Sequence, residues 1–147
     1  MAVASAEELV RLDIPASAPF VGVARTVMAA VASTVPDIDE ERLEDLRIAV
    51  SEACTNAIEA HQSTSTDDHV TVRFLLAEDR VEIHIEDRGP GFDSTAVVAP
   101  DHVDDIDNLT VERGWGIQLI RALVDEAVFR GAGAGTVVHL VVKRGGG

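Results

Sequence analysis

Two residues four positions apart carry the first sign of chemistry in this chain. They are Glu52 and Asn56, in the stretch SEACTNAIEAH (51–61). On a helix this spacing places both side chains on one face. A carboxylate there can take a proton from a hydroxyl group, and a carboxamide oxygen is a hard ligand that suits Mg²⁺. The pair alone also fits an ordinary solvated helix face, so its meaning depends on the rest of the chain.

A glycine-rich stretch with a leading aspartate follows further along. It reads DRGPGF (87–92) and comes directly after an alternating strand pattern. The carboxylate of Asp87 can accept a hydrogen bond from an amino group on a flat ligand such as adenine. Gly89 and Gly91 let the backbone approach such a ligand closely, because they have no Cβ atom. A plain turn after a strand is the alternative interpretation.

A third stretch, RGWGI (113–117), combines two glycines with a cation. Gly114 and Gly116 are expected to open a helix, whose first N–H groups would then be free to bind phosphate. Arg113 beside them could offset the phosphate charge. A loop-to-helix junction without a ligand is the alternative.

Hydrophobic periodicity predicts the elements that position these residues. Alternation over 70–76 and 81–86 predicts an antiparallel hairpin with one buried face. The near-continuous apolar run over 136–143 predicts a central strand, and Asp37 with Glu40 predicts a capping box before the second helix. The remaining predicted strands cover 8–14 and 126–130, and the predicted helices cover 18–33, 38–61 and 116–125.

Composition narrows the class of protein. The 147 residues suffice for one domain (1–147), and 46% hydrophobic residues favour a folded chain. A formal net charge of −14 argues against nucleic acid as a partner. The only lysine, Lys143, is not part of a P-loop motif, and the only cysteine, Cys54, falls on the apolar stripe of its helix. There is neither a signal-peptide pattern nor a long apolar segment, so a cytoplasmic protein away from the membrane is expected.

Taken in order, the three stretches resemble a known family. The arrangement is similar to the ATP-binding module shared by gyrase, the Hsp90 chaperone, histidine kinases and mismatch-repair ATPases, the GHKL or Bergerat superfamily. The length and the wording SEACTNAI look most like bacterial anti-sigma-factor serine/threonine kinases. The resemblance implies an α+β two-layer sandwich, in which helices cover one face of a mixed, mostly antiparallel sheet. It also implies ATP and Mg²⁺ as cofactors.

The resemblance assigns a role to each candidate residue. Glu52 would be the general base, Asn56 the Mg²⁺ ligand, and Asp87 the partner of adenine, supported by Thr136. The backbone contacts and phosphate ligands would be Gly89, Gly91, Arg113, Gly114 and Gly116. The acidic segment 93–112 would be the lid over ATP. This chain departs from the family pattern in its lid, which has no lysine, and in Ala60, where a histidine is usual.

The family also implies partners. It predicts binding of a sigma factor and phosphorylation of an anti-anti-sigma antagonist on serine, with Arg25 as a candidate protein contact and a homodimer left open. Three alternatives remain: a regulatory module that binds nucleotide or a partner without phosphotransfer, a detached histidine-kinase catalytic domain, and a purely structural domain. The lack of room for a phosphoacceptor helix pair counts against the second.

Overall fold

The computed structural model describes residues 5–62, 69–87, 111–131 and 136–144. Along these residues a first strand is followed by two α-helices, a pair of strands, another α-helix and a second pair of strands. The elements in chain order are β1 (Glu7–Pro15), the 3-10 helix η1 (Ala18–Phe20), α1 (Val21–Ala32), α2 (Glu40–Gln62), β2 (His69–Leu76), β3 (Arg80–Asp87), α4 (Val111–Leu123), β4 (Glu126–Gly131) and β5 (Thr136–Lys143).

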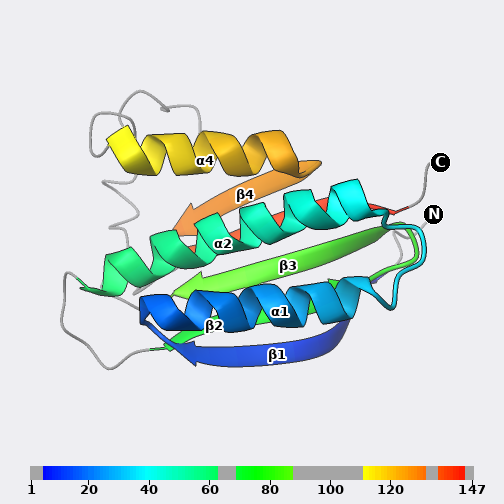
Figure 1. Cartoon of the computed structure of the whole chain (residues 1–147), viewed down its shortest axis with the longest axis horizontal. Coiled ribbons are helices and arrows are strands. Elements are labelled where there is room, and N and C mark those ends of the chain that lie inside the picture. The colour runs from blue at the N-terminus through cyan, green and yellow to red at the C-terminus, as the bar shows by residue number, and fades with distance from the viewer. Residues whose placement is uncertain (1–4, 63–68, 88–110, 132–135, 145–147) are drawn as a thin grey trace.

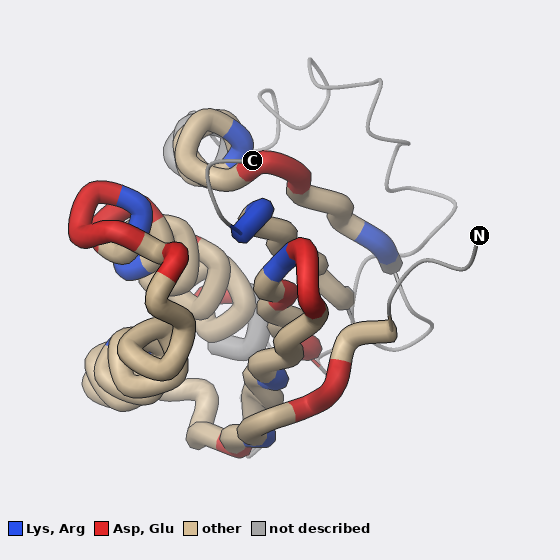
Figure 2. The backbone as a smooth tube through the Cα atoms, turned by 90° about the vertical axis from the view of Figure 1, so that its right-hand side faces the viewer, with Lys and Arg blue, Asp and Glu red and all other residues tan. Residues whose placement is uncertain are grey.

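The five strands form one sheet in the order β1-β2-β3-β5-β4. The three α-helices of the described residues lie on one face of this sheet (Figures 1 and 2), so the predicted two-layer α+β sandwich is confirmed. The apolar strand β5 lies between β3 and β4, which confirms its interior position. Every strand pair among the described residues is antiparallel, so the parallel component expected of a mixed sheet is not found in this part of the chain.

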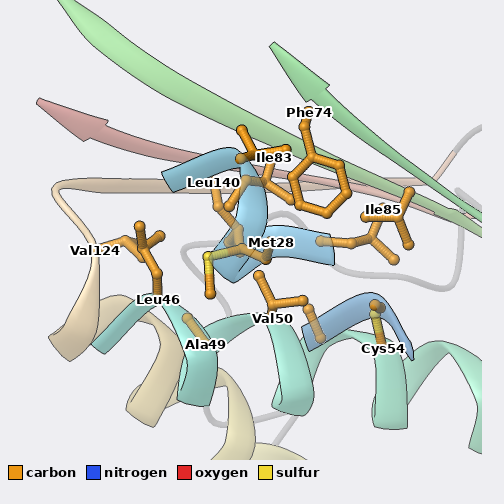
Figure 3. Close-up of a cluster of buried hydrophobic side chains, with 14 of the residues drawn as sticks. Met28, Leu46, Ala49, Val50, Cys54, Phe74, Ile83, Ile85, Val124 and Leu140 are labelled. Carbon is orange, nitrogen blue, oxygen red and sulfur yellow. The ribbon is translucent and has the colours of Figure 1, made fainter. Parts of the chain in front are cut away.

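The core lies between the sheet and the helices (Figure 3). Helix α2 contributes a continuous buried stripe, because apolar residues recur every three or four positions; its fully or nearly fully buried members include Leu46, Ala49, Val50, Ala53 and Cys54. Burial raises the pKa of the Cys54 thiol to about 12, so this group stays protonated near neutral pH. Its interpretation as a core residue is confirmed.

The beginning of α2 differs from the prediction. Helix α2 starts at Glu40, and the residue before it, Asp39, accepts a hydrogen bond from the backbone N–H of Arg42 through its Oδ1 at 2.8 Å. Asp39 therefore caps the helix, and the prediction that Asp37 does so is wrong. Asp37 instead forms an ion pair with Arg144, with Oδ2 and Nε 3.4 Å apart.

Among the described residues, no helix is long and apolar enough to cross a membrane.

Candidate functional site

The first part of the site lies on the C-terminal half of α2. Glu52 and Asn56 are both half-buried, whereas Ala53, Cys54 and Ala57 on the neighbouring face are buried in the core. The two polar side chains therefore lie at the margin between core and solvent, as their spacing predicts. A helix in contact with the sheet holds them, so their backbone positions are fixed by packing and not by a loop.

The second part of the site is the N-terminal half of α4, and here the prediction needs a correction. The helix begins at Val111 and not at residue 116. Gly114 and Gly116 therefore lie inside the first two turns, and the expectation that the helix opens at these glycines is wrong. Only the first turn of a helix leaves its N–H groups unpaired. Residues 111 and 112, predicted to be irregular, are also helical.

Gly116 brings the two helices into contact at the polar pair. A Cβ atom added to Gly116 would lie 3.0 Å from Glu52 Oε2 and 3.3 Å from Asn56 Nδ2. A contact of 3.0 Å is tighter than nearly all that real Cβ atoms make, so a larger residue would push these side chains aside. Glycine inside a helix costs about 1 kcal/mol relative to alanine. The close approach to Glu52 and Asn56 gives a physical reason for glycine at this position.

The third part of the site is the end of β3. Asp87 is the last residue of this strand and only 5% exposed, and it is the only buried ionisable residue besides Cys54 in the described part of the chain. Burying a carboxylate is costly unless it has partners, which makes such a residue a candidate for function. Thr136, at the start of β5, is directly opposite Asp87 in the strand register. The backbones of the two residues are therefore neighbours, and a supporting role for Thr136 stays a prediction.

The three parts lie at one end of the sandwich. Figure 1 shows the end of β3, the C-terminal half of α2 and the beginning of α4 together at the left of the view. Arg113 belongs to α4 by its backbone. Gly89, Gly91 and most of the predicted lid, residues 93–110, lie outside the described residues.

A fourth feature next to the polar pair was not predicted from the sequence. Arg25 on α1 donates a hydrogen bond from Nη1 to Ser51 Oγ on α2 at 3.4 Å. Ser51 directly precedes Glu52, so the cation lies close to the site. One sequence signal could have indicated that the site extends along this part of α2. Ile48 lies four residues before Glu52 and shares its helix face.

The fold and the site together define a class of ATP-binding domain. Residues 14–142 match the family model of the histidine kinase-like ATPase domain, and the chain belongs to this family. Among curated proteins it is similar to the serine-protein kinase RsbW of Bacillus pumilus, with 40% identity over 124 residues that cover 81% of this chain and 76% of the relative. RsbW of Bacillus subtilis is 35% identical over 125 residues, with the same coverage of the two chains.

Solved structures show the same fold. One contains the RsbU and RsbW domains of a Mycobacterium tuberculosis protein and matches with a TM-score of 0.67 at 20% identity, over 92% of this chain and 32% of that chain. Another is the SiaB–SiaC complex of Pseudomonas aeruginosa, with a TM-score of 0.66 at 14% identity, over 92% of this chain and 90% of that chain. At these identities the likeness concerns the fold alone.

Proposed function

We propose that the chain is an ATP-dependent serine kinase and anti-sigma factor that acts by partner switching. The observation that carries this proposal is the close contact of Gly116 on α4 with Glu52 and Asn56 on α2. This contact supports a site in which a carboxylate, a carboxamide and the beginning of a helix converge. The 40% identity to a serine-protein kinase over most of the chain supports the reaction class.

Glu52 is the general base in this proposal, and ATP supplies the phosphoryl group. Within the described part of the chain the Glu52 carboxylate has no hydrogen bond or ion pair, so it is available to accept a proton. As the serine oxygen forms its bond to the γ-phosphorus, the bond from that phosphorus to the ADP oxygen breaks. The serine proton moves to Glu52. A general base of this kind contributes roughly 10²- to 10⁴-fold to the rate.

Asn56 is proposed to bind Mg²⁺ through its carboxamide oxygen. No group of three or more His, Cys, Asp or Glu side chains among the described residues could hold a metal ion. This fits Mg²⁺, which usually takes one or two protein ligands and completes its shell with phosphates and water. The proposed metal would therefore arrive with the nucleotide.

The adenine end of the site is proposed to lie at Asp87. A buried carboxylate at a strand end can accept a hydrogen bond from the adenine amino group, and Thr136 is proposed to support it from the adjacent strand. The backbone of Gly89 and Gly91 would line the base. The phosphates would lie against the beginning of α4, near Arg113, Gly114 and Gly116, where the positive end of the helix dipole favours anions.

The proposed partners are a sigma factor and a serine-bearing antagonist, with Arg25 as a contact. The alternative is a module that holds a partner without phosphotransfer. To separate the two, the antagonist is captured from the source cells, purified, and incubated with the chain and γ-labelled ATP. Glu52→Gln should retain ATP and lose about 10²- to 10⁴-fold in transfer, whereas Glu41→Gln, in the first turn of the same helix, should behave as wild type.

Two outcomes would contradict the proposal. Transfer by Glu52→Gln at the wild-type rate would remove Glu52 as the base. A wild-type chain that binds nucleotide and partner but transfers no label would establish the non-catalytic module instead.

A further inference from the structure

A groove runs between α1 and α2 on the side of the molecule where these helices contact each other. Its volume is about 510 Å³. Three residues of α1 and five of α2, of mixed charge and polarity, line it: Arg25, Thr26, Ala29, Glu44, Arg47, Ile48, Ser51 and Glu52. All of them belong to the two helices, so the groove does not depend on any loop.

The groove reaches the proposed catalytic carboxylate. Glu52 lines it and, at the same time, lies next to Gly116 on α4. Glu52 therefore marks the border between the groove and the proposed nucleotide side of the site. A polypeptide segment in the groove would lie beside Glu52, where a serine hydroxyl could reach its carboxylate.

Two arginines, Arg25 and Arg47, line the groove together with two glutamates, Glu44 and Glu52. Arg25 has only the 3.4 Å contact to the neutral Ser51 hydroxyl among the described residues. Arg47 pairs with Glu44 at 3.1 Å, but the two side chains are 40% and 61% exposed. An exposed pair of this kind contributes about 0–1 kcal/mol, so an incoming carboxylate can compete for Arg47. In a chain of net charge −14, these guanidinium groups are a local site for an anion.

An apolar surface lies between these charges. Ile48 is 39% exposed, which is high for a large aliphatic side chain, and Ala29 lines the groove beside it. A segment with a carboxylate and a small apolar side chain near its serine would match both features. The two arginines can form bidentate hydrogen bonds to such a carboxylate.

We infer that the groove binds the segment of the substrate protein that flanks its phosphorylated serine, and that Arg47 together with Arg25 binds a carboxylate side chain of that segment. This inference rests on the proposed kinase function. Arg47 is then a specificity-determining residue, because it selects the substrate sequence and takes no part in the chemistry. The sigma factor is the competing occupant, and the contact of the groove with Glu52 favours the serine-bearing substrate.

The test uses the antagonist purified as above. The variants are Arg47→Glu, the double variant with Arg25→Glu, and Arg11→Glu on β1 as a control of equal charge change away from the groove. We expect KM and the Kd for the unphosphorylated antagonist to rise at least about tenfold in the groove variants, with kcat and ATP affinity unchanged. The effect should shrink at high salt. An Asp or Glu to Lys change near the serine of the antagonist should restore binding to Arg47→Glu.

Two outcomes overturn the inference. Unchanged KM and Kd in the double variant would exclude the groove from substrate binding. Weakened binding of the sigma factor with intact binding of the antagonist would assign the groove to the sigma factor. If the wild-type chain transfers no phosphate, the kinase proposal fails, while the antagonist Kd still decides whether the groove binds that protein.

Discussion

The two ends of the sandwich are built in different ways. At the end away from the site, the beginning of α2 and the ends of α4 and β5 are held together by charged side chains. Asp125 pairs with Arg42 and accepts a hydrogen bond from the backbone N–H of Lys143 at 2.6 Å. Arg144 donates to the Ala77 carbonyl at 2.8 Å. These contacts join the helix side of the sandwich to the sheet at this end.

At the site end, several residues are not the ones that would favour stability most. Gly116 stands inside a helix although alanine would favour the helix more, and Asp87 is buried at a strand end. Glu52 is half-buried without a described hydrogen bond. Local departures from the most stable choice are typical of functional sites. The comparison predicts that changes at the site end alter activity with little effect on stability, and that changes at the other end do the opposite.

The largest effect on nucleotide binding is expected from Asp87→Asn. In the proposed site one carboxylate oxygen that faces the adenine amino group becomes an N–H donor, so ATP affinity should fall about 10- to 150-fold, the scale of one hydrogen bond to a charged group. Isothermal calorimetry measures this. Asp13→Asn is the matched control, because Asp13 also lies in a strand and accepts a hydrogen bond from Thr71 Oγ1 at 2.6 Å. Equal ATP affinities of a folded Asp87→Asn variant and wild type would remove Asp87 from the pocket.

The next effect is expected from Gly116→Ala. The added Cβ would lie 3.0 Å from Glu52 Oε2, so the carboxylate must shift by a few tenths of an ångström. Because a displacement of about 1 Å can cost up to about 100-fold in rate, we expect this smaller shift to lower kcat by up to about 10-fold, while the melting temperature stays equal or rises. Gly22→Ala is the control, since its Cβ would have only ordinary contact, 3.8 Å from Arg25 Nη2. If both variants keep full activity, the close approach has no catalytic role.

The elements around the site could be predicted because their signals are local. The periodic apolar residues of α2 and the alternation in β2 and β3 specify buried faces without reference to distant residues. The pairing of Glu52 with Asn56 follows from helical spacing alone. These predictions agree with the structure to within a few residues at each end.

Features that depend on distant contacts could not be predicted. Gly114 and Gly116 predict a helix that opens at residue 116, but α4 packs on α2 and begins at Val111, before both glycines. Tertiary packing here outweighs the low helix propensity of glycine. The groove depends on the contact between α1 and α2, as Arg25 and Ser51 are 26 residues apart. A contact between residues so far apart in the chain has no local sequence pattern that could predict it.

A smaller effect, on stability, is expected at the other end from Asp125→Ala. It leaves the backbone N–H of Lys143 without its acceptor, which should cost about 1–3 kcal/mol in the free energy of unfolding, with kcat unchanged. Burial raises the pKa of Asp125, but the hydrogen bonds from Lys143 and Arg42 outweigh it and lower the pKa below 3.8. Its contribution is therefore present above pH 3.8 and is lost as the pH falls through the folded-state pKa. Urea titrations of wild type and Asp125→Ala should show that their free energies of unfolding differ less at acidic pH than at neutral pH.

The smallest effect is expected in the middle of the sheet, between the two ends of the sandwich. His139 on β5 stacks on His84 of β3, with ring centroids 3.8 Å apart. Burial lowers the pKa of His139 below 6.5, and the charges of His84 and Arg130 lower it further, against the opposing effect of Glu82 and Glu86. The unfolded chain then takes up this proton first, so stability should fall as the pH drops through 6.5 towards the folded-state pKa.

His139→Phe keeps a flat ring in the stack and removes the titrating group. We expect the slope of unfolding free energy against pH between about 7.5 and 5.5 to become shallower in this variant. His69→Phe is the control, because His69 is exposed at the start of β2 and its loss should leave the slope nearly unchanged. An unaltered slope in His139→Phe would mean that the folded chain takes up the proton as readily as the unfolded chain does. The loss of stability at acidic pH would then come from other groups, such as Asp125, whose folded-state pKa is lowered.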